Sequence, residues 1–113
     1  MTENGCIFCR IARKEIPAKL VGENDLALAF WDVSPRQPLH ILVIPKLHYA
    51  NVAELTLNDE KSLVSVMKLA SELALEHAEE SFRFSFNTGA GAGQTVFHAH
   101  AHLTSQTPRS ESA

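Results

Sequence analysis

Apolar and polar residues alternate along the chain in short blocks whose period differs from block to block. Residues 6–14 carry apolar side chains at roughly helical spacing, and Pro17 disfavours the helical conformation of the residue before it. Two apolar runs, 19–22 and 26–31, flank the turn sequence GEND and predict a β-hairpin. The almost wholly apolar run 40–45 predicts a strand that is buried on both faces.

The second half of the chain contains one long helical pattern and one strongly alternating pattern. Thr56 followed by Asp59 approximates a capping box, and the wide apolar stripe from 57 to 79 predicts a helix that packs on a sheet. Residues 82–87, FRFSFN, alternate phenylalanine with polar side chains, as expected of a strand with two different faces. Residues 105–113 have no apolar periodicity, and we expect a flexible tail there.

The segment GQTVFHAHAHLT, residues 93–104, places three histidines at every second position. If residues 96–103 form a strand, the histidines share one face at a spacing of about 6.6 Å. Phe97, Ala99, Ala101 and Leu103 then share the other face. The small alanines allow the long helix to approach that face, so the imidazoles are left to line a cleft.

Composition limits the classes of protein that this chain can belong to. With 113 residues, of which 45% are apolar and 20% charged, the chain has enough material for one core, and we expect a single domain over residues 1–104. The formal net charge of −3 argues against a nucleic-acid polymer as the main partner, because such binding requires clustered Lys and Arg. A small phosphorylated ligand remains compatible with this charge.

The first residues, MTENGCIFCR, lack the basic start and apolar run of a secretory signal, and no stretch has the length needed to span a bilayer. We therefore expect a cytoplasmic protein without membrane contact. In a reducing compartment the pair Cys6 and Cys9 indicates a metal or redox site rather than a structural disulfide.

Three interpretations of the histidine segment follow from its residues. The histidines can be surface residues on an exposed strand, although three of them in period two next to a glycine-rich loop argue against this. They can be metal ligands, although three ligands from one strand lie too far apart to share one tetrahedral ion without help. One imidazole can instead be a nucleophile that attacks phosphorus and forms a covalent intermediate.

The residues before the histidines favour the nucleophile. Gly91, Gly93, Gln94 and Thr95 offer backbone N–H groups, an amide and a hydroxyl, which together form the kind of donor cluster that binds phosphate oxygens. The glycines alone are weak evidence, because a turn between two strands also requires them.

The stretch HAHAHLT resembles the His-x-His-x-His signature of the histidine triad (HIT) superfamily. From CIFCRIARKEIPAKLV through FWDVSP, PLHILVIPKLHYANV and GAGQTVFHAHAH, the chain is similar to the Hint branch of that superfamily. The resemblance implies an α+β domain with a five-stranded antiparallel sheet, one long helix and one short helix, usually assembled as a homodimer. It also implies hydrolysis of nucleoside phosphoramidates or related nucleotidyl conjugates, with purines favoured.

The resemblance assigns three groups of site residues. It makes His100 the nucleophile on the α-phosphorus, and the catalytic group comprises His40, His100 and His102. The phosphate-binding group comprises Asn87, Gly93, Gln94 and Thr95. The nucleoside-binding group, in which Asp32 accepts hydrogen bonds from the ribose, comprises Ile7, Phe8, Ile11, Phe30, Asp32 and Val33. Without the resemblance, the sequence indicates only that Asp32 is a turn residue and that the apolar residues of the nucleoside-binding group belong to the core.

The resemblance also gives the two cysteines a role. Related proteins hold a structural zinc with such a pair, a later histidine and the first histidine of the triad, which here implies the ligands Cys6, Cys9, His48 and His98. Two thiolates and two imidazoles make a closed tetrahedral site, as is typical of structural zinc. The alternative is that both cysteines are free thiols, because some Hint proteins bind no metal.

The chain departs from the family after His102. The residues that follow the triad here differ from those usual in the family; they are Thr104, Ser105 and Gln106. In the family this segment shapes the leaving-group side of the site. A nucleotide-binding or scaffold protein with little turnover is therefore the alternative to a hydrolase. A zinc-dependent hydrolase that uses the triad as ligands ranks lower on geometry.

Overall fold

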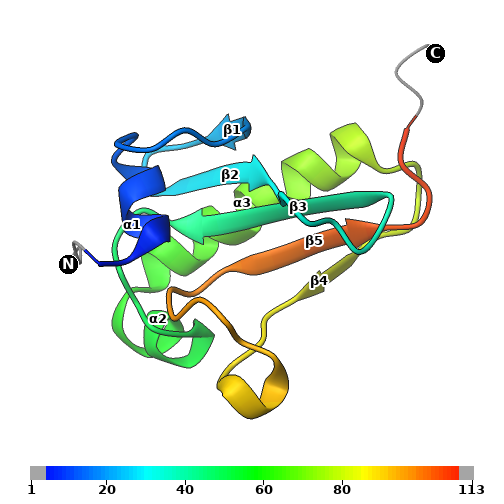
Figure 1. The fold of residues 1–113 in the computed structure, drawn as a ribbon. Helices are drawn as coiled ribbons and strands as arrows, with labels where there is room; N and C mark the ends of the chain where they lie inside the picture. The colour runs from blue at the N-terminus through cyan, green and yellow to red at the C-terminus, as the bar shows by residue number, and fades with distance from the viewer. Residues whose placement is uncertain (1–4, 110–113) are drawn as a thin grey trace.

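A five-stranded antiparallel sheet is the centre of the computed structural model, which describes residues 5–109 (Figure 1). The strand order is β1-β2-β3-β5-β4. The strands are β1 (Leu20–Glu23), β2 (Ala27–Trp31), β3 (Leu39–Pro45), β4 (Arg83–Ser85) and β5 (Ala101–Ser105). The helices are α1 (Ile7–Ala12), α2 (Val52–Asn58) and α3 (Glu60–His77), with one 3-10 turn, η1 (Ala90–Ala92). The α+β class and the antiparallel sheet expected from the sequence are confirmed.

The middle strand β3 is buried along its whole length, as its apolar run predicts. It pairs with β2 on one side and with β5 on the other, so both of its edges are hydrogen-bonded. The predicted hairpin of β1 and β2 is present, and the Asn24 side chain organises its turn by accepting from the backbone N–H groups of Leu26 and Ala27.

Helix α3 covers one face of the sheet (Figure 1). Its apolar stripe, including Val66, Leu69 and Leu73, packs against Ala101 and Leu103 of β5 in the larger core cluster. The sequence expectation that small residues on β5 admit this helix is therefore met at Ala101. Gly22 on β1 serves the same purpose, because a Cβ there would lie 3.1 Å from the Leu69 Cδ1 atom.

The helix expected to begin after Thr56 is instead two helices. Thr56 lies inside α2, where its hydroxyl donates to the Val52 carbonyl, and Asn51 caps the start of α2. Asp59 then leaves helical geometry and caps α3 by accepting from the backbone N–H and the hydroxyl of Ser62. The expected boundary was wrong because the cap residue of the second helix lies directly after the last turn of the first.

The histidine segment is a strand over only part of the expected range 96–103. Residues 96–98 form a bend and β5 begins at Ala101. Pro45, at the end of β3, has no backbone N–H, so the ladder between β3 and β5 cannot continue past this point. Phe97, expected on the helix side, is 52% exposed.

Residues 105–109 lie against the end of α3. The backbone N–H of Arg109 donates to the His77 carbonyl at 2.7 Å, and that of Glu79 donates to the Thr107 carbonyl at 3.0 Å. The rest of the tail expected from the sequence, residues 110–113, lies outside the described residues. Among the helices in the described part of the chain, none has the length and apolar character needed to cross a membrane.

Candidate functional site

A cavity of about 680 Å³ lies on the face of the sheet opposite α3. Twelve of the thirteen residues that the sequence assigns to catalysis, phosphate binding or nucleoside binding line it. They are Ile7, Phe8, Ile11, Phe30, Asp32, Val33, His40, Asn87, Gly93, Thr95, His100 and His102. Residues of helix α1 and of strands β2, β3 and β5 are thus brought to one site.

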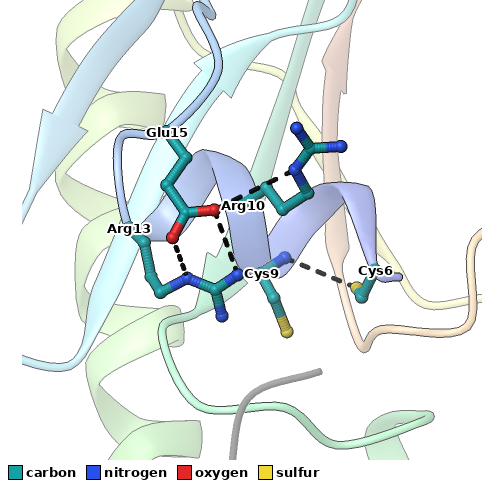
Figure 2. Close-up of polar contacts among 5 residues, drawn as sticks. All are labelled: Cys6, Cys9, Arg10, Arg13 and Glu15. Carbon is teal, nitrogen blue, oxygen red and sulfur yellow. Dashed lines mark hydrogen bonds and ion pairs between the residues drawn. The ribbon is translucent and has the colours of Figure 1, made fainter. Parts of the chain in front are cut away.

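Helix α1 forms the apolar wall of this cavity. Its six residues are too few for a stable isolated helix, so contacts at both ends hold it. At its start the Cys9 backbone N–H donates to Cys6 Sγ, and after its end Glu15 pairs with Arg13 at 2.6 Å and with Arg10 at 3.9 Å (Figure 2). Lys14, at φ 61, turns the chain away from the helix.

The apolar wall is a slot between α1 and the sheet. The Phe8 ring meets the Phe30 ring edge to face, with 5.4 Å between the centroids, and Ile11 packs in the same cluster. Asp32 follows β2 at the polar end of the slot, where its Oδ1 accepts from the Ser34 backbone N–H. Val33 is 96% exposed and lies on the rim.

Four side chains at the start of α1 form a compact group of possible metal ligands. Cys6 Sγ lies 3.4 Å from His98 Nδ1, and Cys9 Sγ lies 3.3 Å from His48 Nδ1 and 3.5 Å from His98 Nδ1. All four ligand atoms lie within 4.8 Å of one another. The sequence-predicted set of Cys6, Cys9, His48 and His98 is therefore brought together.

The geometry of this group fits zinc. Bonds of about 2.3 Å to sulfur and about 2.0 Å to nitrogen around a tetrahedral ion separate neighbouring ligand atoms by about 3.5 Å, close to the spacings observed. His98 Nε2 lies 2.9 Å from the Pro45 carbonyl oxygen, which can only accept. His98 Nδ1 therefore has no proton and presents its lone pair to the group, as a metal-binding histidine must.

His100 is held in a single tautomer. Its Nδ1 lies 2.7 Å from the His98 carbonyl oxygen and must donate, so Nε2 carries a free lone pair. Burial lowers the pKa of His100, which favours the neutral ring. The Phe8 ring packs edge-on against the imidazole at 5.1 Å and fixes its plane. A neutral, oriented imidazole with an unused lone pair is a suitable nucleophile.

His40 and His102 form a second hydrogen-bonded pair beside His100. His40 Nδ1 accepts from the Arg36 backbone N–H at 3.2 Å, so in the neutral ring Nε2 carries the proton. That N–H donates to His102 Nδ1 at 3.0 Å, and Asp32 Oδ2 lies 3.4 Å from the same nitrogen. Burial lowers the pKa of His102 to about 4, and its Nε2 is buried without a hydrogen-bond partner within the described residues.

The glycine loop is less open to a ligand than the sequence suggests. The N–H groups of Gly93 and Gln94 donate to the carbonyls of Ala90 and Gly89 within the turn. The Gln94 amide accepts from the Gly89 N–H and donates to the Ala50 and Val96 carbonyls, so this side chain holds the loop and does not line the cavity. Gly93 adopts φ 93, which requires glycine.

Thr95 and Asn87 keep polar groups directed to the cavity. Both line it, and within the described residues neither side chain has a hydrogen-bond partner. A Cβ at Gly93 would lie 3.7 Å from Asn87 Nδ2, which places the two residues side by side. The phosphate end therefore offers a hydroxyl and an amide beside His100.

Comparison with known proteins identifies the family. The model of the HIT domain matches residues 13–109. The chain belongs to the HIT family. An uncharacterized HIT-like protein of Synechococcus elongatus is 46% identical over 98 residues, which are 86% of each chain.

Two further relatives of this HIT domain carry descriptive names. The purine nucleoside phosphoramidase of Escherichia coli K12 is 38% identical over 104 residues, which are 90% of this chain and 87% of the relative. A solved structure described as a HIT family hydrolase from Clostridium thermocellum superposes with a TM-score of 0.85 at 37% identity, covering 99% of this chain and 96% of the other.

Sequence reasoning missed several residues that line the cavity of this HIT domain. At the end away from α1 they are Arg36, Gln37, Arg83, Ser85 and Thr104. For three of these residues, the period-two alternation of side chains along a strand could have predicted that they face the cavity. Arg83 and Ser85 have the parity of Asn87 in one strand, and Thr104 has the parity of His102 in the other. Arg36 and Gln37 come from the loop before β3, where no periodicity indicates a direction.

Proposed function

We propose that this HIT protein is a nucleotide-binding hydrolase that cleaves purine nucleoside 5'-phosphoramidates or related nucleotidyl conjugates. The observation that carries the proposal is the tautomer of His100, whose Nδ1 donates to a backbone carbonyl and whose Nε2 is left with a lone pair at the cavity. The name of the Escherichia coli relative supports the substrate class.

The reaction has two steps at phosphorus. The lone pair of His100 Nε2 attacks the α-phosphorus, and a new N–P bond forms as the bond to the leaving nitrogen breaks. The leaving nitrogen takes the electron pair and a proton from solvent and departs as an amine. Water then attacks the same phosphorus, an O–P bond forms as the N–P bond breaks, and the proton of the water passes to solvent. The electron pair of the broken bond returns to His100 Nε2, and the nucleoside monophosphate leaves.

Neighbouring residues bind and orient the substrate in this proposal. Thr95 and Asn87 hold the phosphate oxygens, and the slot that contains Phe8 and Phe30 takes the base. Asp32, with one carboxylate oxygen near His40, accepts hydrogen bonds from the ribose hydroxyls. Backbone N–H groups of Gly93 and Gln94 are used inside the loop, so these residues contribute the shape of the phosphate end.

We assign a structural zinc to Cys6, Cys9, His48 and His98. Four protein ligands close the tetrahedron, so the ion would stabilise the fold near the site and would leave no position for substrate. Because α1 carries both cysteines and Phe8, the ligands also fix the apolar wall of the slot.

Two properties implied by the family resemblance belong to the same proposal. We propose a homodimer, for which β4 is an edge strand with the exposed Phe82 beside it. We also propose a cytoplasmic location, where both thiols stay reduced.

The test is incubation with adenosine 5'-phosphoramidate. We expect release of AMP and, after rapid denaturation at alkaline pH, where the N–P bond is stable, an adenylyl adduct on His100 by mass spectrometry. His100→Ala should abolish both, whereas the matched control His77→Ala, at the end of α3, should retain both. Activity that survives in His100→Ala would refute the mechanism.

The alternative is a nucleotide-binding protein with little turnover. AMP binding by calorimetry without measurable release of AMP from the phosphoramidate would favour this alternative. The same titration with 2',3'-dideoxy-AMP reports whether ribose recognition is intact in either case.

A further inference from the structure

The strand register orders the floor of the cavity from an apolar end to a cationic end. Residues opposite each other in antiparallel strands share a face, so two rows cross the cavity. One row runs from Phe30 on β2 to Leu42, His102 and Ser85. The next row contains His40, Thr104 and Arg83. Asp32 lies next to this row, because its backbone N–H donates to the His40 carbonyl. The β4 end of both rows lies beyond the histidines when viewed from the nucleoside slot.

Two guanidinium groups line this far end. Arg83 comes from the edge strand β4, and Arg36 comes from the loop before β3, so they approach from separate elements. Both are exposed, and neither forms an ion pair with an acidic side chain of the described residues. The charge of Arg36 is close enough to His102 to lower the pKa of that ring, in addition to the larger effect of burial.

The acidic residues are arranged differently. Asp32 is the one carboxylate among the described residues that line the cavity, and it lies at the nucleoside end, where its Oδ1 atom is used by the Ser34 backbone N–H. The far end thus combines two arginine side chains with the hydroxyls of Ser85 and Thr104, and no acidic side chain from the described part of the chain lines it.

We propose that Arg36 and Arg83, with Ser85 and Thr104, form a leaving-group subsite that selects a leaving amine bearing a carboxylate or a phosphate. The inference rests on the proposed function, because it concerns the half of the substrate that departs from phosphorus. A planar guanidinium matches either anion with two parallel hydrogen bonds, and the hydroxyls donate to the remaining oxygens. Nothing in this subsite takes part in the covalent steps, so Arg36 and Arg83 are specificity residues.

The test compares substrates that differ in one anionic group. Adenosine 5'-phosphoramidates are made with glutamic acid α-amide and with glutaminamide, which differ only in the side-chain carboxylate. A second pair uses phosphoethanolamine and ethanolamine, and it separates a phosphate anion from a carboxylate. In each pair the ratio of kcat/KM, anionic over neutral, is measured at low and at high salt.

We expect a ratio above one in at least one pair, and the larger ratio identifies the preferred anion. Exposed charge pairs contribute up to about 1 kcal/mol, so each arginine is expected to raise the ratio by roughly fivefold. Arg36→Gln and Arg83→Gln should each lower the ratio by that factor, and their combination should bring it near one. Added salt should lower the wild-type ratio, because both cations are exposed.

The control Lys68→Gln removes one positive charge from α3, on the other side of the sheet, and should keep the wild-type ratio. Ratios of one or less in both pairs, or ratios unchanged in the double variant, would overturn the subsite. If none of the four substrates releases AMP, the proposed function fails instead, so the two failures are distinguishable.

Discussion

Removal of the proposed zinc is predicted to destabilise the whole domain. Cys9 and His98 are fully buried, and the four ligand atoms converge from α1, from the segment after β3 and from the bend before β5. Their convergence therefore connects three segments that are distant in the sequence. Zinc present at about 100 to 1,000 times its Kd stabilises a folded chain by about 2.7 to 4.1 kcal/mol.

The expected change in melting temperature follows from the size of the chain. An unfolding entropy of about 2.1 cal/mol/K per residue gives about 0.24 kcal/mol/K for 113 residues. The stabilisation above then corresponds to a Tm difference of roughly 11 to 17 °C. We expect a chelator strong enough to remove zinc to lower Tm by this amount, and added zinc to restore it.

The assay is thermal unfolding followed by circular dichroism, with elemental analysis of the same samples. Wild-type protein purified without chelator should contain about one zinc per chain, and His48→Gln should lose both the zinc and the Tm difference. His77→Gln, which changes a histidine outside the ligand group, should keep both. Wild-type protein without zinc and with the same Tm before and after zinc addition would refute the assignment.

Three further predictions concern the capping, titration and ribose recognition of named residues. Asp59→Ala removes the cap of α3 and the acceptor for the Tyr49 hydroxyl, and should lower the unfolding free energy by about 1 to 2 kcal/mol in urea titrations, whereas the exposed Asp25→Ala should leave it almost unchanged. Burial lowers the pKa of His102 from 6.5 to about 4, so between these pH values the unfolded chain binds more protons than the folded chain. The free energy of unfolding should therefore fall as pH falls from 6.5 to about 4. His102→Gln should reduce this dependence of stability on pH, and an unchanged dependence would contradict the burial argument. Asp32→Asn should reduce by about tenfold the preference for a ribonucleoside phosphoramidate over its 2',3'-dideoxy form, and an unaltered preference would remove Asp32 from the ribose contact.

Alternation along single strands predicted much of the site. The parity of the histidine segment placed His100 and His102 on the cavity face and Ala101 and Leu103 against α3. The same alternation places Asn87 on the opposite face of residues 82–87 from the phenylalanines. Period-two alternation works here because a strand side chain has only two directions, so one correct face fixes the others.

The start of β5 and the hydrogen bonds of the glycine loop could not be predicted from the sequence pattern. The strand was expected to start at residue 96, but it begins at Ala101, because Pro45 of the neighbouring strand lacks the N–H that would extend the ladder. The backbone N–H groups of Gly93 and Gln94 were expected to bind a ligand, whereas the closed turn uses them internally. Both outcomes depend on partners that are distant in sequence or set by loop conformation.

The bend that shortens β5 also separates the two roles proposed for the histidines, metal binding and catalysis. His98, before the strand, directs its side chain to the cysteines and donates to the Pro45 carbonyl, the backbone acceptor that the interrupted ladder leaves free. Its own carbonyl then accepts from His100 Nδ1 and sets the tautomer of that ring. In the proposed mechanism, His98 can therefore hold a metal with its side chain and orient the nucleophile His100 with its backbone carbonyl. The spacing of two residues matters because it brings the carbonyl of one residue within reach of the next imidazole on the same face.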